Sequence, residues 1–280
     1  YYPVINDIVP APRLAVRYVP VETWLVRLAG GLYSQPPQEI ERSVDFGNPN
    51  IRAPRSWHVS AGLEKDFRGG GSKGFVATLG GFYRAFDQLV IPTSAMVEKD
   101  GSLAPLNYTN DGKGRAFGGE AMVKYDIGPV DGWLAYTLSR STRWDPANAE
   151  YVFRYDQTHL LTALVGWNIG WNWRLGARFR YVTGNPTTPV ASATYDADYD
   201  TYEPIYGVKN SQRLEPFWQL DLRLDKKFIF RDWMLSFYID VQNVTNHANV
   251  ELTQYAYDYS ASSNITGLPI LPMFGVKAEF

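Results

Sequence analysis

The chain has 280 residues, enough for one large domain or two small ones, and a formal net charge of −2 at pH 7. This near-neutral balance argues against nucleic acid as a partner. The absence of cysteine excludes a disulfide framework, a zinc-thiolate site and a thiol nucleophile. No apolar run reaches the ~18–20 residues of a transmembrane helix.

Alternation of apolar and polar residues, the period of a β-strand, recurs along the whole chain. We expect about eleven strands, over residues 13–19, 24–33, 56–66, 74–91, 113–126, 132–142, 157–168, 171–183, 217–228, 233–245 and 272–280. The clearest alternation is in 171–183, where Leu175 and Phe179 are interleaved with Arg178 and Arg180. The apolar positions that we expect to face lipid are Leu175, Phe179, Leu220, Leu222, Phe237 and Ile239.

Short and long connections alternate strictly between these strands. Short turns fall at 20–23, 67–73, 127–132, 168–171 and 229–233, and long loops at 34–55, 92–112, 143–156, 184–215 and 246–270. Bacterial outer-membrane barrels have short periplasmic turns and long extracellular loops. Tryptophans also gather beside the short turns, as in an interfacial girdle: Trp24, Trp133, Trp167, Trp171, Trp173 and Trp233.

These patterns predict an all-β fold, a transmembrane antiparallel up-and-down β-barrel, rather than a soluble sandwich. The nineteen tyrosines, nine tryptophans and twenty-four glycines suit a barrel that is apolar on only one face. We expect residues 1–280 to form a single barrel portion. About eleven strands is an odd number, whereas single-chain bacterial barrels are usually even, so further strands are expected from an N-terminal part or from a separate chain.

The last strand places Phe274, Val276, Ala278 and Phe280 on one face. An ordinary edge strand is one explanation. The other is a resemblance to the C-terminal signal that outer-membrane barrels present to their assembly machinery, with Gly275 and Phe280 as its marked residues. Met273 and Ala278 depart from that signal, which usually has a polar and a large apolar residue there. The signal implies a C-terminus on the periplasmic side.

Charged residues on the polar face form the first candidate site. Arg174, Arg178 and Arg180 share one strand face, and acidic residues with one arginine follow on the next strands: Asp221, Arg223, Asp225 and Asp240. These residues are expected to line a lumen, either as cross-strand ion pairs or as a contact surface for a plug or a path for substrate.

Aromatic residues in two long loops form the second candidate site: Tyr195, Tyr199, Tyr202, Tyr206, Tyr255 and Tyr257. They are expected either to grip a ligand or to act as lids on the outer leaflet. Asp196, Asp198 and Asp200 alternate nearby, but Thr201 and Gly207 replace the residues that an EF-hand loop requires. A solvated acidic loop is favoured there, and a looser calcium site stays open. The histidines, His58, His159 and His247, are separated, and we expect no catalytic residues, resident metal or cofactor.

Several stretches resemble the C-terminal half of TonB-dependent outer-membrane receptors, in order over residues 12–280. They are Gly47-Asn48-Pro49, the segments 54–57, 62–64, 83–90, 110–120 and 183–186, and the segment 240–246 before the last loop. Arg55 stands where the family has glutamate.

This resemblance implies a 22-stranded barrel filled by an N-terminal plug. It further implies import across the Gram-negative outer membrane of a scarce ligand, namely a siderophore, vitamin, glycan or peptide. The implied partners are lipid, the N-terminal barrel half, the plug, TonB through the plug, and the barrel-assembly machinery. The alternative is a structural barrel subunit or passive pore in a larger assembly.

Overall fold

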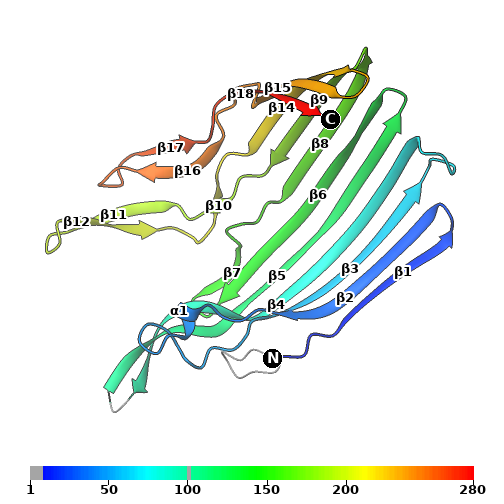
Figure 1. Ribbon diagram of the computed structural model, residues 1–280. Coiled ribbons are helices and arrows are strands. Elements are labelled where there is room, and N and C mark those ends of the chain that lie inside the picture. The colour runs from blue at the N-terminus through cyan, green and yellow to red at the C-terminus, as the bar shows by residue number, and fades with distance from the viewer. Residues whose placement is uncertain (1–8, 100–101) are drawn as a thin grey trace.

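The computed structural model describes residues 9–99 and 102–280 and contains one extended antiparallel sheet (Figure 1). Eleven strands follow one another along its path in the described chain. They are β1 (Arg13–Val21), β2 (Trp24–Ser34), β3 (Arg55–Asp66), β4 (Gly74–Lys99), β5 (Ser102–Ile127), β6 (Val130–Asp145), β8 (His159–Gly170), β9 (Trp173–Val182), β14 (Phe217–Ile229), β15 (Met234–Gln242) and β18 (Leu271–Glu279). Each predicted strand is therefore present, with ends that differ by a few residues at most positions.

The register confirms that one face of the sheet is apolar and the other polar. Phe179 lies opposite Leu220, and Leu224 lies opposite both Leu175 and Ile239. Arg178 lies opposite Asp221 on the other face. Because cross-strand partners share a face, the apolar residues predicted above form one continuous surface across the last strands.

The long loops contain more regular structure than the sequence predicted. The segment 92–112 was expected as a loop, but its described residues, 92–99 and 102–112, instead continue β4 and β5, with Ile91 paired to Thr109 and Val97 to Ala104. The register shifts between Phe86 and Leu89, and again between Thr93 and Met96. These irregularities interrupt the strict alternation, so the two-residue period that marks a strand is lost there.

Other loops carry short elements outside the main path. Loop 34–55 contains the helix α1 (Glu39–Arg42), and β7 (Asn148–Val152) pairs with β6. Loop 184–215 contains β10 (Pro186–Thr187), β11 (Val190–Asp196), β12 (Thr201–Tyr206) and β13 (Gln212–Arg213), and loop 246–270 contains β16 (Val250–Tyr255) and β17 (Ser262–Thr266). Among the described residues no helix is long and apolar enough to cross a bilayer.

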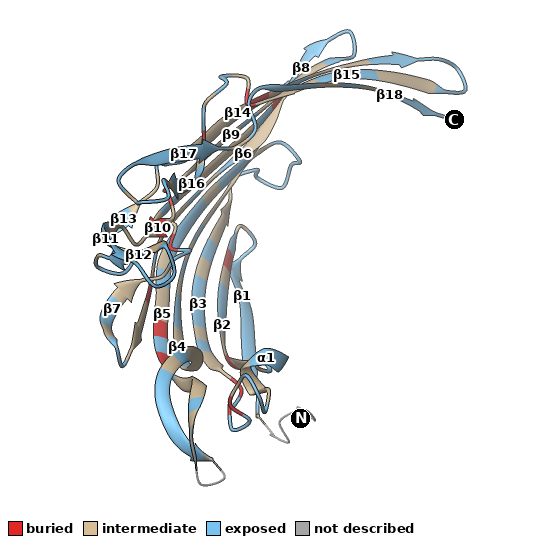
Figure 2. Ribbon diagram, turned by 90° about the vertical axis from the view of Figure 1, so that its left-hand side faces the viewer, coloured by how far each residue is buried: buried red, intermediate tan, exposed pale blue. Residues whose placement is uncertain are grey.

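The sheet is a curved wall and does not close on itself (Figure 2). Strands β1 and β18 lie at opposite edges and do not pair with each other, as the odd strand count predicted. Figure 1 shows the short turns at one end of the wall and the long loops at the other. The C-terminus lies with the short turns, where Phe280 stacks on Trp233 at 6.1 Å between ring centroids.

Candidate functional site

An ion-pair network occupies the polar face of β9 and β14. The guanidinium of Arg178 donates from Nε and Nη2 to one oxygen of Asp221, at 2.8 and 2.6 Å. The other carboxylate oxygen accepts from the Gln219 amide at 2.6 Å and from the Asn243 backbone N–H at 2.9 Å. Asp221 is only 6% exposed, so these four bonds compensate the burial of its charge.

A second part of the network links β14 to the last two strands. Arg223 forms ion pairs with Asp225 at 2.8 Å and with Asp240 at 3.6 Å. Its guanidinium also lies 4.0 Å from the centre of the Tyr238 ring. That ring covers Gly275 on β18, where any Cβ would clash with it. In this arrangement the ring occupies the space that a side chain at position 275 would take, so a larger residue there would have to displace Tyr238.

One member of this network, Asp131, was not predicted from the sequence. Arg174 lies opposite Asp225 in the register, yet its Nη2 bonds Asp131 of β6 at 2.7 Å. Strand β8 lies between β6 and β9 in the sheet, so one strand separates the two residues. The intervening residue is Gly166, over which the Arg174 side chain lies. A glycine between an acid and an arginine on the same face is the signal that could have revealed this contact.

Six of the seven predicted charged residues line one depression of about 380 Å³ on the polar face: Arg174, Arg178, Asp221, Arg223, Asp225 and Asp240. Arg180 lies outside it. Its nearest polar partner is Gln219, at 3.4 Å, and its guanidinium lies 5.2 Å from the Phe217 ring. Since the charges are largely paired with one another, the arrangement suits contact with a polar surface or with water.

The predicted loop aromatics do not form one cluster, but two of them, Tyr195 and Tyr257, contact a third, Tyr202. Tyr202 lies 5.2 Å from Tyr195 and 5.6 Å from Tyr257, measured between ring centroids. The hydroxyl of Tyr257 donates to the backbone oxygen of Asp200, and that of Tyr195 donates to the Asp200 side chain at 2.8 Å. The hydrogen bond to Asp200 raises the pKa of Tyr195. These contacts join the β11–β12 hairpin to loop 246–270.

The remaining aromatics lie elsewhere. Tyr255 contacts Tyr259, with 5.7 Å between ring centroids, while Tyr199 is 79% exposed and Tyr206 borders a cavity between the loops. Asp196 and Asp200 accept local hydrogen bonds. In the part of the chain that the structure describes, no group of three carboxylate or histidine side chains is placed to hold a metal ion.

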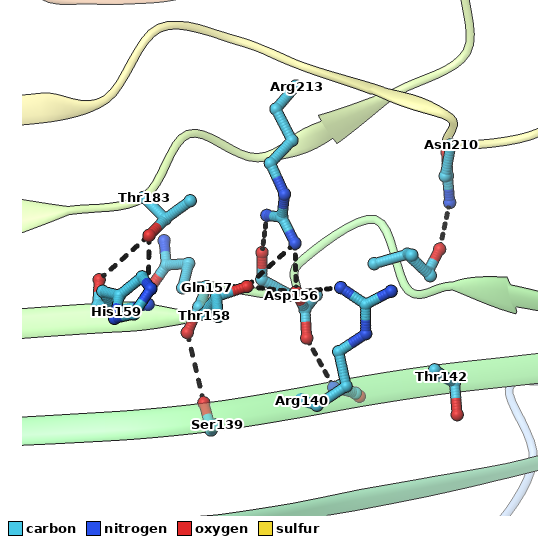
Figure 3. Close-up of polar contacts among 12 residues, drawn as sticks. Ser139, Arg140, Thr142, Asp156, Gln157, Thr158, His159, Thr183, Asn210 and Arg213 are labelled. Carbon is cyan, nitrogen blue, oxygen red and sulfur yellow. Dashed lines mark hydrogen bonds and ion pairs between the residues drawn. The ribbon is translucent and has the colours of Figure 1, made fainter.

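A buried carboxylate, Asp156, anchors loop 184–215 to the wall. Figure 3 shows Arg213 and Arg140 approaching it from opposite sides. Asp156 is 1% exposed, and it also accepts hydrogen bonds from the Ser141 backbone N–H and the Thr158 hydroxyl. Arg213 further donates to the backbone oxygens of Asp156 and Gly184, at 2.8 and 2.9 Å. Nothing in the spacing of these residues indicated this cluster.

A cavity of about 890 Å³ lies at the long-loop end, on the side of the polar face. Its wall is built from four loop regions and the adjoining strand ends: residues 35–41, 89–91 with 112–113, 143–154, and 186–210. This volume is typical of small-molecule sites, and the loops that form it are those predicted to be extracellular. The sequence did not indicate the cavity, because it depends on how four distant loops meet.

Comparison with known proteins is consistent with this architecture. Residues 6–244 match the family model described as TonB dependent receptor-like, beta-barrel. No curated protein gives a significant match to the sequence. Similar solved structures include the ferripyoverdine receptor of the outer membrane of Pseudomonas aeruginosa bound to ferripyoverdine, at 15% identity and a TM-score of 0.65, covering 95% of this chain and 32% of that one.

Two further structures share the fold. The ferric citrate transporter FecA in its unliganded form has 17% identity and a TM-score of 0.67, with 97% of this chain and 38% of that chain covered. The ferric-catecholate import receptor Fiu from E. coli K12 has 18% identity and a TM-score of 0.61, with 95% and 34% covered. The chain thus spans about a third of the length of these structures, whose descriptions name receptors and transporters.

Proposed function

The chain belongs to the TonB dependent receptor-like β-barrel family, and on that premise we propose that it forms part of the barrel wall of a receptor that imports a scarce ligand across the Gram-negative outer membrane. The match over residues 6–244 is the observation that carries this proposal. The two-faced sheet supports it, because a wall between lipid and a wet lumen needs one apolar and one polar face. The descriptions of similar structures name ferripyoverdine, ferric citrate and ferric catecholate as what those proteins bind or import, so a ferric chelate is the first ligand class to test.

In this proposal the apolar face contacts lipid and the long loops lie outside the cell. The short turns and the C-terminus then lie in the periplasm, where Phe280 and Gly275 belong to the signal read by the barrel-assembly machinery. The network around Arg178, Asp221 and Arg223 contacts a plug that fills the lumen and engages TonB. The N-terminal barrel half pairs with the two free edges of the sheet.

The test is uptake by cells that carry the full-length receptor as their sole route for ferric chelates. We expect energy-dependent accumulation of radiolabelled iron that disappears when either the receptor gene or the TonB gene is deleted. Accumulation that requires the receptor but survives loss of TonB would instead support a passive pore. If deleting the receptor leaves uptake of every chelate and of cobalamin, maltooligosaccharide and peptide probes unchanged, the import proposal is wrong.

A further inference from the structure

The cavity at the long-loop end is rich in positive charge. Among the described residues that border it are four cations, Lys113, Arg143, Arg154 and Lys209, and one acid, Glu41. Glu41 is already engaged, because its carboxylate accepts the backbone N–H of Gln38 at 2.7 Å. A cavity with this imbalance of charge favours the entry of an anion.

Within the described chain, only one of the four cations has a carboxylate partner. Lys209 donates to Asp145 at 3.2 Å. Arg154 lies 5.0 Å from the centre of the Tyr155 ring, and neither Arg154 nor Lys113 forms an ion pair with a described residue. Arg143 also lacks a carboxylate partner there. Of these three cations only Arg143 is partly buried, whereas Lys113 and Arg154 are exposed. A cation that is partly removed from water without a counter-charge gains more from a bound anion than a solvated one does.

Arg143 is the cation whose side chain is held most firmly. Its guanidinium lies 4.4 Å from the Phe86 ring centre and 4.1 Å from that of Phe153. Nη1 donates to the Thr142 backbone oxygen at 2.8 Å and to the Ser141 hydroxyl at 3.2 Å. The stem crosses Gly114 on β5, where a Cβ would clash with it. The aromatic rings and the glycine thus fix the guanidinium, and Nη2 has no hydrogen-bond acceptor among the described residues.

Aromatic and cationic groups alternate around Arg143. Tyr151 lies on the same side as Phe153, with the Lys209 ammonium 4.0 Å from its ring centre, and Trp144 also borders the cavity. A planar guanidinium matches the two oxygens of a carboxylate, catecholate or phosphate, and the rings offer faces on which a flat ligand can stack. Both features select a ligand with anionic oxygens on a planar body.

We propose that this cavity binds the imported ligand as an anion, and that Arg143 is the residue that recognises its negatively charged oxygens. The inference rests on the proposed function, since it names the ligand class for the same receptor. Lys113 and Arg154 add positive charge around the cavity, and Lys209 stays paired with Asp145 as part of the wall.

The test compares two ferric chelates of similar size on the full-length receptor. Ferric tris-catecholate carries three negative charges, whereas ferric tris-hydroxamate is neutral. Binding is followed by quenching of intrinsic tryptophan fluorescence, for which Trp144 is a reporter in the cavity wall. We expect the anionic chelate to bind about 10- to 100-fold more tightly, the range that one charge-assisted hydrogen bond provides.

Substitution then assigns the preference to Arg143. Arg143→Gln should reduce the preference by about 10-fold or more, and Arg143→Lys should retain part of it, because the charge remains while the planar fork is lost. Arg115→Gln is the matched control: Arg115 lies at the same end of the sheet but on the opposite face, paired with Glu150. This control should keep the wild-type preference.

Three results would overturn the inference: equal or tighter binding of the neutral chelate, an unchanged preference in Arg143→Gln, or no binding of either chelate. TonB-dependent import of a neutral compound in the uptake assay would at the same time leave the proposed function intact. Loss of both import and binding would remove both proposals together.

Discussion

At the residue scale, Asp156 shows how one carboxylate can position a long loop. Two arginines from different parts of the chain, Arg140 and Arg213, share it, and its oxygens also accept a backbone N–H and a hydroxyl. Because the carboxylate is buried and fully hydrogen-bonded, removing its charge leaves Arg213 without its counter-ion. The loop it anchors carries Tyr206 and Lys209, both of which border the cavity.

We therefore expect Asp156→Asn to loosen loop 184–215 without unfolding the wall. A weakened buried contact of this kind costs about 1–3 kcal/mol, which raises local opening roughly 5- to 150-fold. Hydrogen exchange of residues 207–214 measures the opening. Asp196→Asn is the control, because that side chain accepts only a local backbone N–H. Unchanged exchange in Asp156→Asn would show that the cluster does not hold the loop.

The Asp145–Lys209 pair predicts a dependence of the same loop on pH. Strand β6 has sixteen residues, more than the ~9–11 that span a bilayer, so its last residue lies beyond the hydrocarbon. Burial acts to raise the pKa of Asp145, but hydrogen bonds from Asn148 and Lys209 outweigh it and the pKa falls below its ordinary value. Burial acts to lower the pKa of Lys209, but the hydrogen bonds to Tyr151 and Asp145 outweigh it and raise that pKa above its ordinary value.

The two pKa shifts determine how the stability of the Asp145–Lys209 contact changes with pH. The lowered pKa of Asp145 contributes stability that is present above its unfolded value of 3.8 and is lost as pH falls through the folded value. Lys209 contributes stability that is present below 10.5 and lost as pH rises through its raised pKa. Between these limits the contact should be intact. Exchange of residues 207–211, corrected for intrinsic rates, should rise below pH 3.8, and Lys209→Met should abolish that rise; a rise already at pH 6 would contradict the assignment.

At the scale of elements, the sheet predicts opposite tolerances on its two faces. Leu222 lies between Ala177 and Val241 on the apolar face, while Thr137 lies opposite Glu120 on the polar face. Leu222→Arg should cost about 2–4 kcal/mol if it lies near the bilayer midplane. Thr137→Arg should cost little, because the new charge meets Glu120 in a wet lumen. Denaturant titration of the receptor refolded in vesicles measures both, and equal costs would refute the assignment of faces.

Strand positions were predictable from sequence because each strand separates lipid from water. That contrast imposes a strict period of two, which is clearest where Leu175 and Phe179 alternate with Arg178 and Arg180. The hairpin beyond residue 91 escaped prediction because bulges near Gln88 and Asn107, both with positive φ, break the period. The face on which each residue lies could thus be predicted only where the alternation continues without interruption.

The candidate site was predictable in part, for a related reason. Charged residues on one face of adjacent strands must meet, so the pairing of the arginines in 171–183 with the acids that follow, as in Arg178 with Asp221, could be predicted from alternation and order. The contact of Arg174 with Asp131 passes over a glycine, and the cavity around Arg143 needs four loops to converge. The Arg174–Asp131 contact joins strands that are not neighbours, so pairing of adjacent strands did not predict it, although the intervening glycine was a signal. Loop geometry has no period, so the cavity could not be predicted from spacing.

At the scale of the whole molecule, the free edge of β1 carries an unbalanced charge. Arg17 lies directly opposite Arg27, whose carboxylate partner is Glu64 at 2.5 Å, and Arg17 has no carboxylate partner in the described chain. Like charges in direct opposition destabilise a strand pair. We expect the strand that pairs with β1 in the complete barrel to place an acidic side chain beside Arg17.

Arg17→Gln in the full-length receptor shows whether the strand that pairs with β1 places an acidic side chain beside Arg17. With an acidic neighbour present, the substitution should lower stability by about 0.2–1 kcal/mol, the range of a cross-strand ion pair. Without one, it relieves repulsion with Arg27 and the receptor becomes as stable or more stable. Thermal unfolding of the receptor in detergent, compared with Arg13→Gln, measures the difference; Arg13 has instead the Tyr33 ring at 4.4 Å.

The two edges also define the larger assembly. Eleven antiparallel strands leave β1 and β18 running in the same direction, so direct closure would demand a parallel pair between them. Open edges within lipid are strongly disfavoured, since each unpaired backbone group costs several kcal/mol. The free backbone groups of both strands therefore require partners beyond the eleven strands described.

The central claim is that this sheet is one portion of a larger receptor barrel. Its most direct test is a cryo-electron microscopy structure of the native polypeptide that carries this chain, purified from the outer membrane. We expect β1 and β18 each to form backbone hydrogen bonds to an antiparallel strand outside the eleven, around a lumen filled by a plug that contacts the polar face. A closed barrel of eleven strands, with β1 hydrogen-bonded directly to β18, would contradict it.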